Sequence, residues 1–262
     1  MPEWDPRLYL KFGAERSRPA LDLAMRAKTL LETAAAPRIL DLGCGPGNST
    51  AVLAAIFPGA SIVGLDSSPE MIDSAQKSGV EAEWVLRDAA SYRPVGLFDL
   101  VFSNAALQWI PDQDSLLSRM YGWLKPAGVL AIQVPGNGES PLHRALRRTA
   151  ADSAWGTRFE GLDDLIRYEE PPFYFEALAP TGAQAEVWES TYWHVLANRQ
   201  ALIDWYSGTG MRPWLERAAD EAERQAFKDA VLEAAAPGYP LRADGSLFFP
   251  FRRIFVTAVR PR

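Results

Sequence analysis

Cysteine, histidine and long apolar runs are scarce in this chain of 262 residues. Cys44 is the single cysteine, which excludes a disulfide within the chain. Because the only histidines are His143 and His194, and no His, Cys and carboxylate residues cluster at ligand spacing, we predict no metal site. No apolar run is long enough to cross a bilayer, so we expect no membrane partner. The segment Met1–Leu10 is acidic and contains proline, unlike a secretion signal, and the expected compartment is the cytoplasm.

A basic excess is also missing. Lys and Arg total 27 against 33 Asp and Glu, which gives a formal net charge of -6. Nucleic acid is therefore excluded as an expected partner, because its binding needs concentrated positive charge. Hydrophobic residues make up 48% of the chain, enough for a large core. The length suits one large domain or a domain with a subdomain, and no repeat, low-complexity linker or obligate protein partner is evident.

The most informative stretch is Arg38–Asn48, R-I-L-D-L-G-C-G-P-G-N. A short apolar run that includes Asp41 leads into three alternate glycines, and the helix-like segment 49–57 follows. A strand, a glycine turn and a helix form the context in which a glycine-rich loop binds a ligand. The glycines allow a sharp turn and close approach of a ligand to the backbone; they are Gly43, Gly45 and Gly47.

The spacing of this loop distinguishes between ligands. It is G-x-G-x-G, whereas the dinucleotide fingerprint is G-x-G-x-x-G. Pro46 removes one N–H from the loop, and Asp41 brings a negative charge close to it. Both features disfavour a pyrophosphate, and hence a nicotinamide oxidoreductase, and favour a cationic ligand that carries an amino acid group. A tight turn without a ligand is the structural alternative.

Further apolar runs follow, and three of them end in or near a polar side chain. They are 61–66 with Asp66, 84–89 with Asp88 and 98–104 with Asn104, and a fifth strand is expected at 129–134. Helices are expected at 18–33, 49–57, 69–78 and 114–124. This alternation predicts an α/β fold with a mostly parallel sheet and right-handed crossovers. Polar residues at the carboxyl ends of such strands line the ligand crevice of open sheets.

After Pro135 the regular alternation of predicted strands and helices ends. Helical segments within 136–180 and 198–246 are expected to form lid insertions, and 1–17 is expected to be an arm on the substrate side. Strand-like patterns at 186–196 and 247–259 suit a late hairpin that adds an antiparallel strand to the sheet.

The glycine loop resembles motif I of the class I S-adenosylmethionine methyltransferases, whose Rossmann-like sheet also ends in a late hairpin. Eight stretches narrow the resemblance to the family of trans-aconitate 2-methyltransferases. They are Y-L-K-F from Tyr9, R-S-R-P-A from Arg16, D-L-G-C-G-P-G-N-S-T from Asp41, D-S-S-P-E-M from Asp66, S-N-A-A-L-Q-W from Ser103, W-E-S-T-Y-W-H-V from Trp188, G-T-G-M-R-P from Gly208 and L-F-F-P-F-R-R from Leu247. The resemblance covers nearly the whole chain and implies one methyltransferase domain over residues 1–262.

On the cofactor side, the resemblance implies S-adenosylmethionine bound by residues of the first four strands. Asp66 would accept both ribose hydroxyls, with capping of the next helix as its alternative role. Asp88 would accept from the adenine amino group, and Met71 would pack on adenine or in the core. Asn104 would face the methionine end or the substrate. The full expected set is Asp41, Gly43, Gly45, Gly47, Asn48, Asp66, Ser67, Met71, Asp88, Ala89 and Asn104.

On the substrate side, the resemblance implies methyl transfer to a carboxylate of trans-aconitate. An acidic protein must hold such a small polycarboxylate through concentrated cationic and phenolic donors. The candidates are Tyr9, Lys11, Arg16, Arg18, Trp109, Tyr192, His194, Arg212, Arg252 and Arg253, although surface arginines and a core histidine are the ordinary alternatives. Two positions depart from the family pattern: Trp193 replaces an expected tyrosine, and Arg252 and Arg253 form a pair where one arginine is expected.

The chemistry predicts no catalytic residue in the strict sense. A carboxylate with a pKa near 4 is ionised at neutral pH, so its methylation needs positioning and not a general base. Cys44 is expected to be a small loop residue and not a nucleophile. A methyltransferase for another small carboxylate, a thioester-linked carboxylate or an amine is the alternative, and a non-catalytic S-adenosylmethionine-binding protein is a further one.

Overall fold

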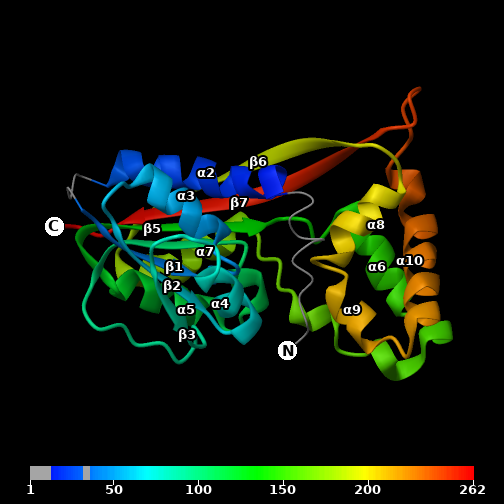
Figure 1. Ribbon diagram of the computed structural model, residues 1–262, viewed down its shortest axis with the longest axis horizontal. Coiled ribbons are helices and arrows are strands. Elements are labelled where there is room, and N and C mark those ends of the chain that lie inside the picture. The colour runs from blue at the N-terminus through cyan, green and yellow to red at the C-terminus, as the bar shows by residue number, and fades with distance from the viewer. Residues whose placement is uncertain (1–12, 32–35) are drawn as a thin grey trace. The chain divides into compact units, whose positions relative to one another are not determined.

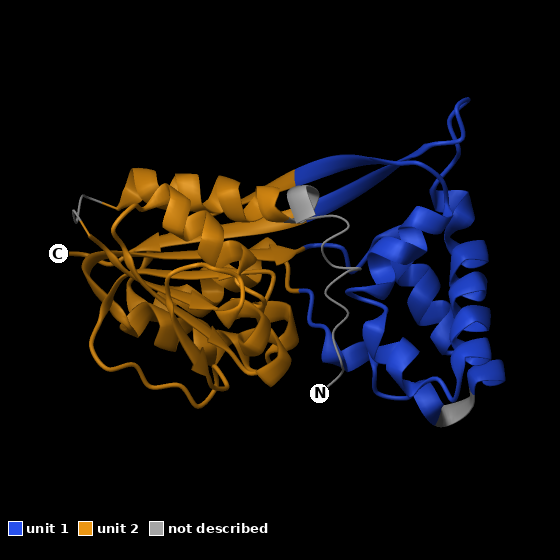
Figure 2. Cartoon of the chain, viewed as in Figure 1, with its two compact units in different colours: residues 1–15, 136–168, 191–252 blue, residues 16–135, 169–190, 253–262 orange. Residues whose placement is uncertain are grey.

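The computed structural model describes residues 13–31 and 36–262, without the side chains of residues 13–16 and 156–157. The chain forms two compact units (Figure 2). Unit 1 comprises residues 1–15, 136–168 and 191–252, and unit 2 comprises residues 16–135, 169–190 and 253–262. Within the described residues, no helix is both long and apolar enough to span a bilayer.

Unit 2 is built on a seven-stranded sheet with the order β3-β2-β1-β4-β5-β7-β6 (Figure 1). The strands β1 to β5 pair in parallel, and β7 runs antiparallel to β5. The strands are β1 (Arg38–Leu42), β2 (Ser61–Asp66), β3 (Glu83–Leu86), β4 (Phe98–Asn104), β5 (Leu124–Pro135), β6 (Gln184–Leu196) and β7 (Leu247–Val259), and the outer ends of β6 and β7 extend into unit 1. This confirms the predicted Rossmann-like sheet with a late antiparallel strand.

The helices of unit 2 connect these strands. They are α2 (Gly13–Leu30), α3 (Asn48–Ile56), α4 (Pro69–Gln76), α5 (Gln113–Gly122) and α7 (Pro171–Leu178), with short 3₁₀ turns η1 (Leu107–Trp109) and η4 (Ala179–Thr181). The chain moves in one direction along the sheet through β1, β2 and β3 and in the opposite direction from β4 to β5. Right-handed crossovers therefore place α3 and α4 on one face and α5 on the other.

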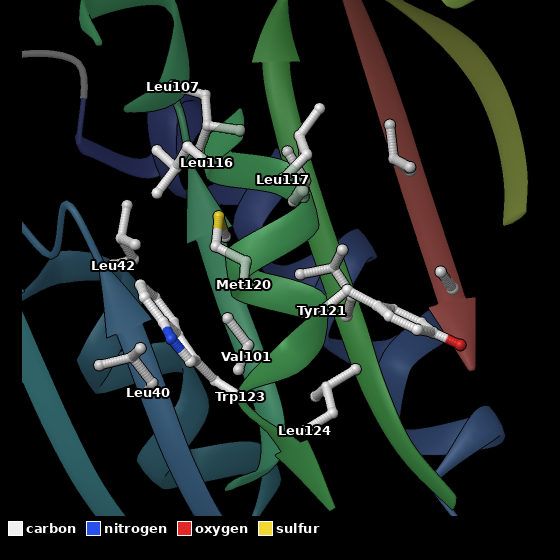
Figure 3. Close-up of a cluster of buried hydrophobic side chains, with 14 of the residues drawn as sticks. Leu40, Leu42, Val101, Leu107, Leu116, Leu117, Met120, Tyr121, Trp123 and Leu124 are labelled. Carbon is white, nitrogen blue, oxygen red and sulfur yellow. The ribbon is translucent and has the colours of Figure 1, made fainter. Parts of the chain in front are cut away.

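The face under α5 is the apolar core of unit 2 (Figure 3). Side chains of α5 and α7 pack there on alternate residues of β1, β4, β5 and β7. The continuous apolar runs of these strands fit burial on both faces, as is usual for parallel sheets. The opposite face, which carries Asp41, is called the Asp41 face below.

The described part of unit 1 is mainly helical. Its elements are α6 (Pro141–Ala150), α8 (Gln200–Ser207), α9 (Arg212–Arg217) and α10 (Glu221–Ala235), with 3₁₀ turns η2 (Ser153–Phe159), η3 (Asp163–Leu165) and η5 (Ala236–Gly238). A separate core joins these helices to the outer end of β7 through buried Leu, Trp, Phe and Tyr side chains. The large aromatic content of the chain is thus used to pack this unit.

Several boundaries differ from the sequence expectation. The third strand ends at Leu86 and not at Ala89, so Asp88 lies in the following turn. Helix α2 begins at Gly13, inside the segment expected to be an arm. Helix α7 packs in the core of unit 2, although its segment was expected in the lid, because its apolar residues Tyr174 and Leu178 are buried against the sheet core. Within the segment 136–180, where helical segments were expected, residues 163–165 form only the short turn η3.

Candidate cofactor and acceptor site

The glycine loop between β1 and α3 adopts backbone conformations that favour glycine. Gly43, Gly45 and Gly47 have φ angles of +71°, +55° and +92°. A Cβ on Gly43 would lie 2.2 Å from the Cβ of Ala106, so this loop abuts the loop that follows β4. A Cβ on Gly45 would meet no atom within 4 Å, which leaves open space beside the middle of the loop.

Asp66, at the carboxyl end of β2, holds this loop. Its Oδ2 accepts a hydrogen bond of 2.9 Å from the N–H of Gly45, and its Oδ1 accepts one of 2.9 Å from the N–H of Ser68. Ser68 caps α4 through a bond of 3.2 Å from the N–H of Met71, so Asp66 is not the helix cap. Burial raises the pKa of Asp66 and the backbone N–H groups oppose this. Each carboxylate oxygen still has a lone pair for a further donor.

Asp41 is fully buried on β1 under the first turn of α3. Its Oδ2 accepts bonds of 2.7 Å from the hydroxyls of Ser49 and Thr50. Its Oδ1 is buried and has no hydrogen-bond partner. Burial raises the pKa of this carboxyl to about 6, and the charge of Asp66 adds to the rise. Asp41 thus stabilises the start of α3 through Oδ2, while Oδ1 remains without a donor.

The other predicted cofactor residues lie after the carboxyl ends of β1, β2 and β3. Asn48 is the first residue of α3, and Met71 is buried in the first turn of α4. Ser67 is half-buried directly after Asp66. Asp88 is exposed, and its Oδ1 accepts a bond of 2.7 Å from the N–H of Ala90, whereas Ala89 is buried in the sheet core.

The register of the central strands collects polar side chains on the Asp41 face. Asp41 lies opposite Phe102, and Phe102 opposite Ala131. One row nearer the carboxyl ends, Asn104 lies opposite Gln133. Alternate residues of a strand share a face, so these rows lie side by side on one surface.

Gln133 was not predicted from the sequence. Its side chain has no exposed surface, and neither its Oε1 nor its Nε2 has a hydrogen-bond partner. The Oδ1 of Asn104 is also buried without a partner. Gln133 lies within the run 129–135 of β5, which is otherwise apolar, and this isolated polar residue was the only sequence signal that could have indicated it.

Arg253 continues this surface. It lies on β7 opposite Pro135, one row beyond Gln133 and Phe255. Its side chain is buried, with only 8% of the residue exposed. The predicted Arg253 and Asn104 therefore belong to the same face of unit 2, with Gln133 between them in the register.

The remaining predicted substrate residues of unit 2 are less enclosed. Trp109 ends η1 and is 43% exposed. Arg18 is exposed on α2 and lies 3.9 Å from the carboxylate of Asp22, the arrangement of a solvated surface pair. Tyr9 and Lys11, together with the side chain of Arg16, lie outside the described residues.

Four predicted substrate residues lie in the described part of unit 1. His194 is packed among aromatic rings, the nearest being Trp205 with a ring-centroid distance of 4.8 Å. Arg212 pairs with Glu216 at 2.7 Å, and Arg252 donates a bond of 3.4 Å to the carbonyl of Gly136. Tyr192 is half-buried on β6. The substrate roles assigned to these residues stay predictions.

Neither His143 nor Cys44 is placed for acid–base or nucleophilic work. His143 is buried in unit 1 and its Nδ1 is hydrogen-bonded to the hydroxyl of Tyr206. Burial and the charge of Arg147 lower the pKa of His143 to about 4. Burial raises the pKa of the Cys44 thiol, so the thiolate is disfavoured.

Comparison with known proteins decides the family. A methyltransferase domain model matches residues 39–128, which contain the glycine loop, Asp66 and Asn104. A trans-aconitate 2-methyltransferase of Methylobacterium radiotolerans is 44% identical over 98% of both chains. Proteins of the same name from Azoarcus sp. and Escherichia coli are 42% and 40% identical, over 99% of this chain and at least 99% of their own length.

The chain belongs to the trans-aconitate 2-methyltransferase family. It is an S-adenosylmethionine-dependent methyltransferase, which confirms the cofactor and the class of enzyme predicted from the sequence.

Solved structures agree on the fold of this family member. YcgJ of Bacillus subtilis matches with a TM-score of 0.59 and 17% identity, over 92% of this chain and 98% of that protein. Phosphoethanolamine N-methyltransferase 2 of Haemonchus contortus, in complex with S-adenosyl-L-methionine, matches with a TM-score of 0.59 and 21% identity, over 92% of this chain and 53% of that one. At such identities the likeness concerns the fold alone.

The residues of this trans-aconitate 2-methyltransferase family member fit S-adenosylmethionine. The open space beside Gly45 gives a ligand access to the loop backbone. The carboxylates of Asp41 and Asp66 suit a ligand with an ammonium, a sulfonium and a ribose diol, and would repel a pyrophosphate. The oxygens Oδ1 of Asp41 and Oδ1 of Asn104 are buried without a partner and would be available as further acceptors for a cationic group.

Proposed function

We propose that this protein transfers the methyl group of S-adenosylmethionine to a carboxylate of trans-aconitate and forms a monomethyl ester. The observation that carries the substrate class is the buried Arg253 on the Asp41 face, one register row beyond Asn104 and Gln133. The relatives that are 40% to 44% identical over nearly the whole chain carry the name of this activity.

The charge of the substrate explains why an arginine is required. Trans-aconitate has three carboxyl groups that are ionised at neutral pH. A protein with a net charge of -6 binds such an anion only where cations are concentrated. A guanidinium pairs with carboxylate through two parallel hydrogen bonds, and burial strengthens the attraction. Arg253 therefore favours an anionic acceptor over an amine.

The cofactor side of the proposal follows the loops of unit 2. The bound S-adenosylmethionine would lie against Gly43, Gly45 and Gly47, with its ribose diol on Asp66. Its methionine end would lie near Asn104, and its adenine near Met71, Asp88 and the backbone of Ala89. Asp41 stabilises the start of α3, which follows directly on this loop.

Positioning would supply the catalysis. The cofactor provides an electrophilic methyl group on a sulfonium, and the acceptor carboxylate is already ionised, so no proton has to be removed. In-line alignment of the acceptor oxygen with the methyl–sulfur bond then lowers the barrier, since orientation alone is worth several orders of magnitude. The buried states of His143 and Cys44 are consistent with a reaction that uses no general base and no covalent intermediate.

The test is a turnover assay with a panel of small acids. Purified protein would be incubated with S-adenosylmethionine and trans-aconitate, cis-aconitate, citrate, isocitrate or itaconate. Release of S-adenosylhomocysteine and the mass of the methyl ester would be measured. We expect trans-aconitate to be methylated with the highest kcat/KM. Binding of S-adenosylmethionine without turnover of any acid would contradict the proposed acceptor and leave a methyltransferase for another substrate.

A further inference from the structure

We propose that the side-chain amide of Gln133 binds the acceptor carboxylate itself and aligns its attacking oxygen. The inference rests on the proposed function and deepens it, because it assigns the reacting carboxyl group to a neutral residue and a remaining carboxyl group to Arg253. The residue was absent from the set predicted from the sequence.

The first argument is the state of the amide. Gln133 has no exposed surface, yet its Oε1 and its Nε2 both lack a hydrogen-bond partner. Buried polar groups in proteins are nearly always bonded, and a buried amide with both ends unpaired needs an explanation. An anionic ligand whose oxygen accepts from Nε2 provides one.

The second argument is position. Gln133 lies two residues before the end of β5, and its backbone carbonyl accepts a bond of 2.8 Å from the N–H of Ala105. Ala106, the next residue of that loop, is the neighbour of Gly43 in the cofactor loop. The Asn104–Gln133 pair therefore lies at the carboxyl ends of β4 and β5, where open α/β sheets bind ligands.

The third argument is the chemistry of charge. During the reaction a negative carboxylate and a positive sulfonium both become neutral. An arginine that clamps both oxygens of the acceptor would stabilise the charge that the reaction removes and would thus favour the ground state. A neutral amide donor orients the carboxylate and leaves it nucleophilic. Arg253, in the next row, is suited to a carboxylate that keeps its charge throughout.

The electron balance of the step is simple. A lone pair of the acceptor oxygen forms the new carbon–oxygen bond to the methyl group. The carbon–sulfur bond breaks and its electron pair stays on sulfur, which becomes a neutral thioether. No proton moves, so Gln133 needs only to donate one hydrogen bond, and the amide is unchanged at the end.

The experiment uses two variants of the full chain. Gln133→Met replaces the amide by an apolar group of similar length. Thr257→Val is the matched control: Thr257 is buried on the same face, its Oγ1 also has no partner, and it lies one row farther from the carboxyl ends, opposite Ala131. Both variants remove an unpaired buried polar group, and neither is expected to lower the melting temperature.

Three quantities would be measured for each protein: the melting temperature, the Kd of S-adenosylmethionine, and kcat/KM for the acceptor. We expect Gln133→Met to lower kcat/KM roughly 10- to 100-fold, the loss of one hydrogen bond to a charged group, and to change the cofactor Kd less than about twofold. Thr257→Val should change neither quantity.

Two results would overturn the inference alone. One is a Gln133→Met protein with wild-type kcat/KM, and the other is a fall in cofactor affinity as large as the fall in kcat/KM, which would make Gln133 a cofactor residue. A wild-type protein that binds the cofactor but methylates none of the acids would overturn the proposed function together with this inference.

Discussion

The carboxylate of Asp66 accepts a hydrogen bond from the backbone N–H of Gly45, with 2.9 Å between Oδ2 and N. The acid that ends β2 thus holds the loop that follows β1. The same group fixes the loop shape and presents the remaining lone pairs to a ligand, so loop geometry and ligand binding depend on one side chain.

This arrangement makes Asp66→Ala a test of both roles. We expect the Kd of S-adenosylmethionine to rise at least roughly 10-fold, since hydrogen bonds from the ribose to a charged group are lost. Stability should also fall by about 1–3 kcal/mol, because the N–H groups of Gly45 and Ser68 lose their acceptor. Calorimetric titration and urea unfolding would measure the two effects.

The control lies on the neighbouring helix. Asp73 is exposed on α4 and pairs with Lys77 at 2.5 Å, so Asp73→Asn removes a carboxylate of similar charge that holds no loop. Its effect on both quantities should be small. An Asp66→Ala protein with wild-type cofactor affinity would contradict the ribose role.

Asp41 makes a contribution to the free energy of unfolding that depends on pH. Burial raises its pKa in the folded protein from 3.8 to about 6. The folded state therefore holds its proton more tightly than the unfolded state, and the stabilisation is complete below pH 3.8 and is lost as the pH rises through 6. The full difference amounts to about 3 kcal/mol at 1.36 kcal/mol per pKa unit.

Asp41→Asn removes this pH-dependent contribution to stability, because the amide does not titrate. We expect the free energy of unfolding of the variant minus that of the wild type to rise by up to about 3 kcal/mol between pH 4 and pH 6.5 and to level off above. Urea unfolding of the cofactor-free proteins at a series of pH values would measure it. A difference that stays constant with pH would show that Asp41 ionises normally.

His143 makes a contribution to the free energy of unfolding that depends on pH in the opposite direction. Burial lowers its pKa from 6.5 to about 4, so the folded state keeps the ring neutral. The unfolded state takes up a proton below pH 6.5, and stability is lost as the pH falls from 6.5 to 4, by about 3 kcal/mol in total. In the wild type this loss is largely offset by the gain at Asp41 over the same pH range.

His143→Gln should therefore expose the stabilising contribution of Asp41 at low pH, which His143 offsets in the wild type. We expect the variant to lose less stability than the wild type on acidification from pH 6.5 to 4, although loss of the bond to Tyr206 lowers its stability at neutral pH. Tyr206→Phe removes the same hydrogen bond and keeps the titrating ring, so it separates the two effects. Equal acid sensitivity of wild type and His143→Gln would contradict the lowered pKa.

The sequence predicted the glycine loop and the ends of the second and fourth strands because their signals are local. A short apolar run that ends in Asp66 or Asn104 is visible in a few residues, and the Ser68 cap with Pro69 is a recognised helix start. The mostly parallel sheet followed from the alternation of strands and helices.

Gln133 could not be predicted in the same way. Its importance depends on register with Asn104 on one side and Phe255 on the other, and these residues are far apart in the sequence. Helix α7 is similar, because its own residues show that it is amphipathic and aromatic but not which core receives it. Pairing between distant segments decides both, and no local pattern encodes it.

Gly64 and Trp84 provide the last prediction, which concerns packing behind the cofactor loop. The two residues lie directly opposite each other on β2 and β3. A Cβ on Gly64 would lie 2.5 Å from Cζ3 of Trp84 and 3.2 Å from Sγ of Cys44. The indole also lies under Gly47, whose Cβ would be 3.1 Å from its Cη2. The absence of a side chain at Gly64 thus makes room for the ring that supports the loop.

Gly64→Ala should lower the stability by about 1–3 kcal/mol through overpacking and weaken cofactor binding, since the displaced indole pushes on the loop. Trp84→Leu in the same chain should restore part of the stability, because the smaller side chain leaves space for the new methyl group. Gly122→Ala is the control, since a Cβ there meets no atom within 4 Å and the residue lies at the end of α5. If Gly64→Ala and Gly122→Ala unfold at the same urea concentration, the contact between Gly64 and Trp84 does not support the loop.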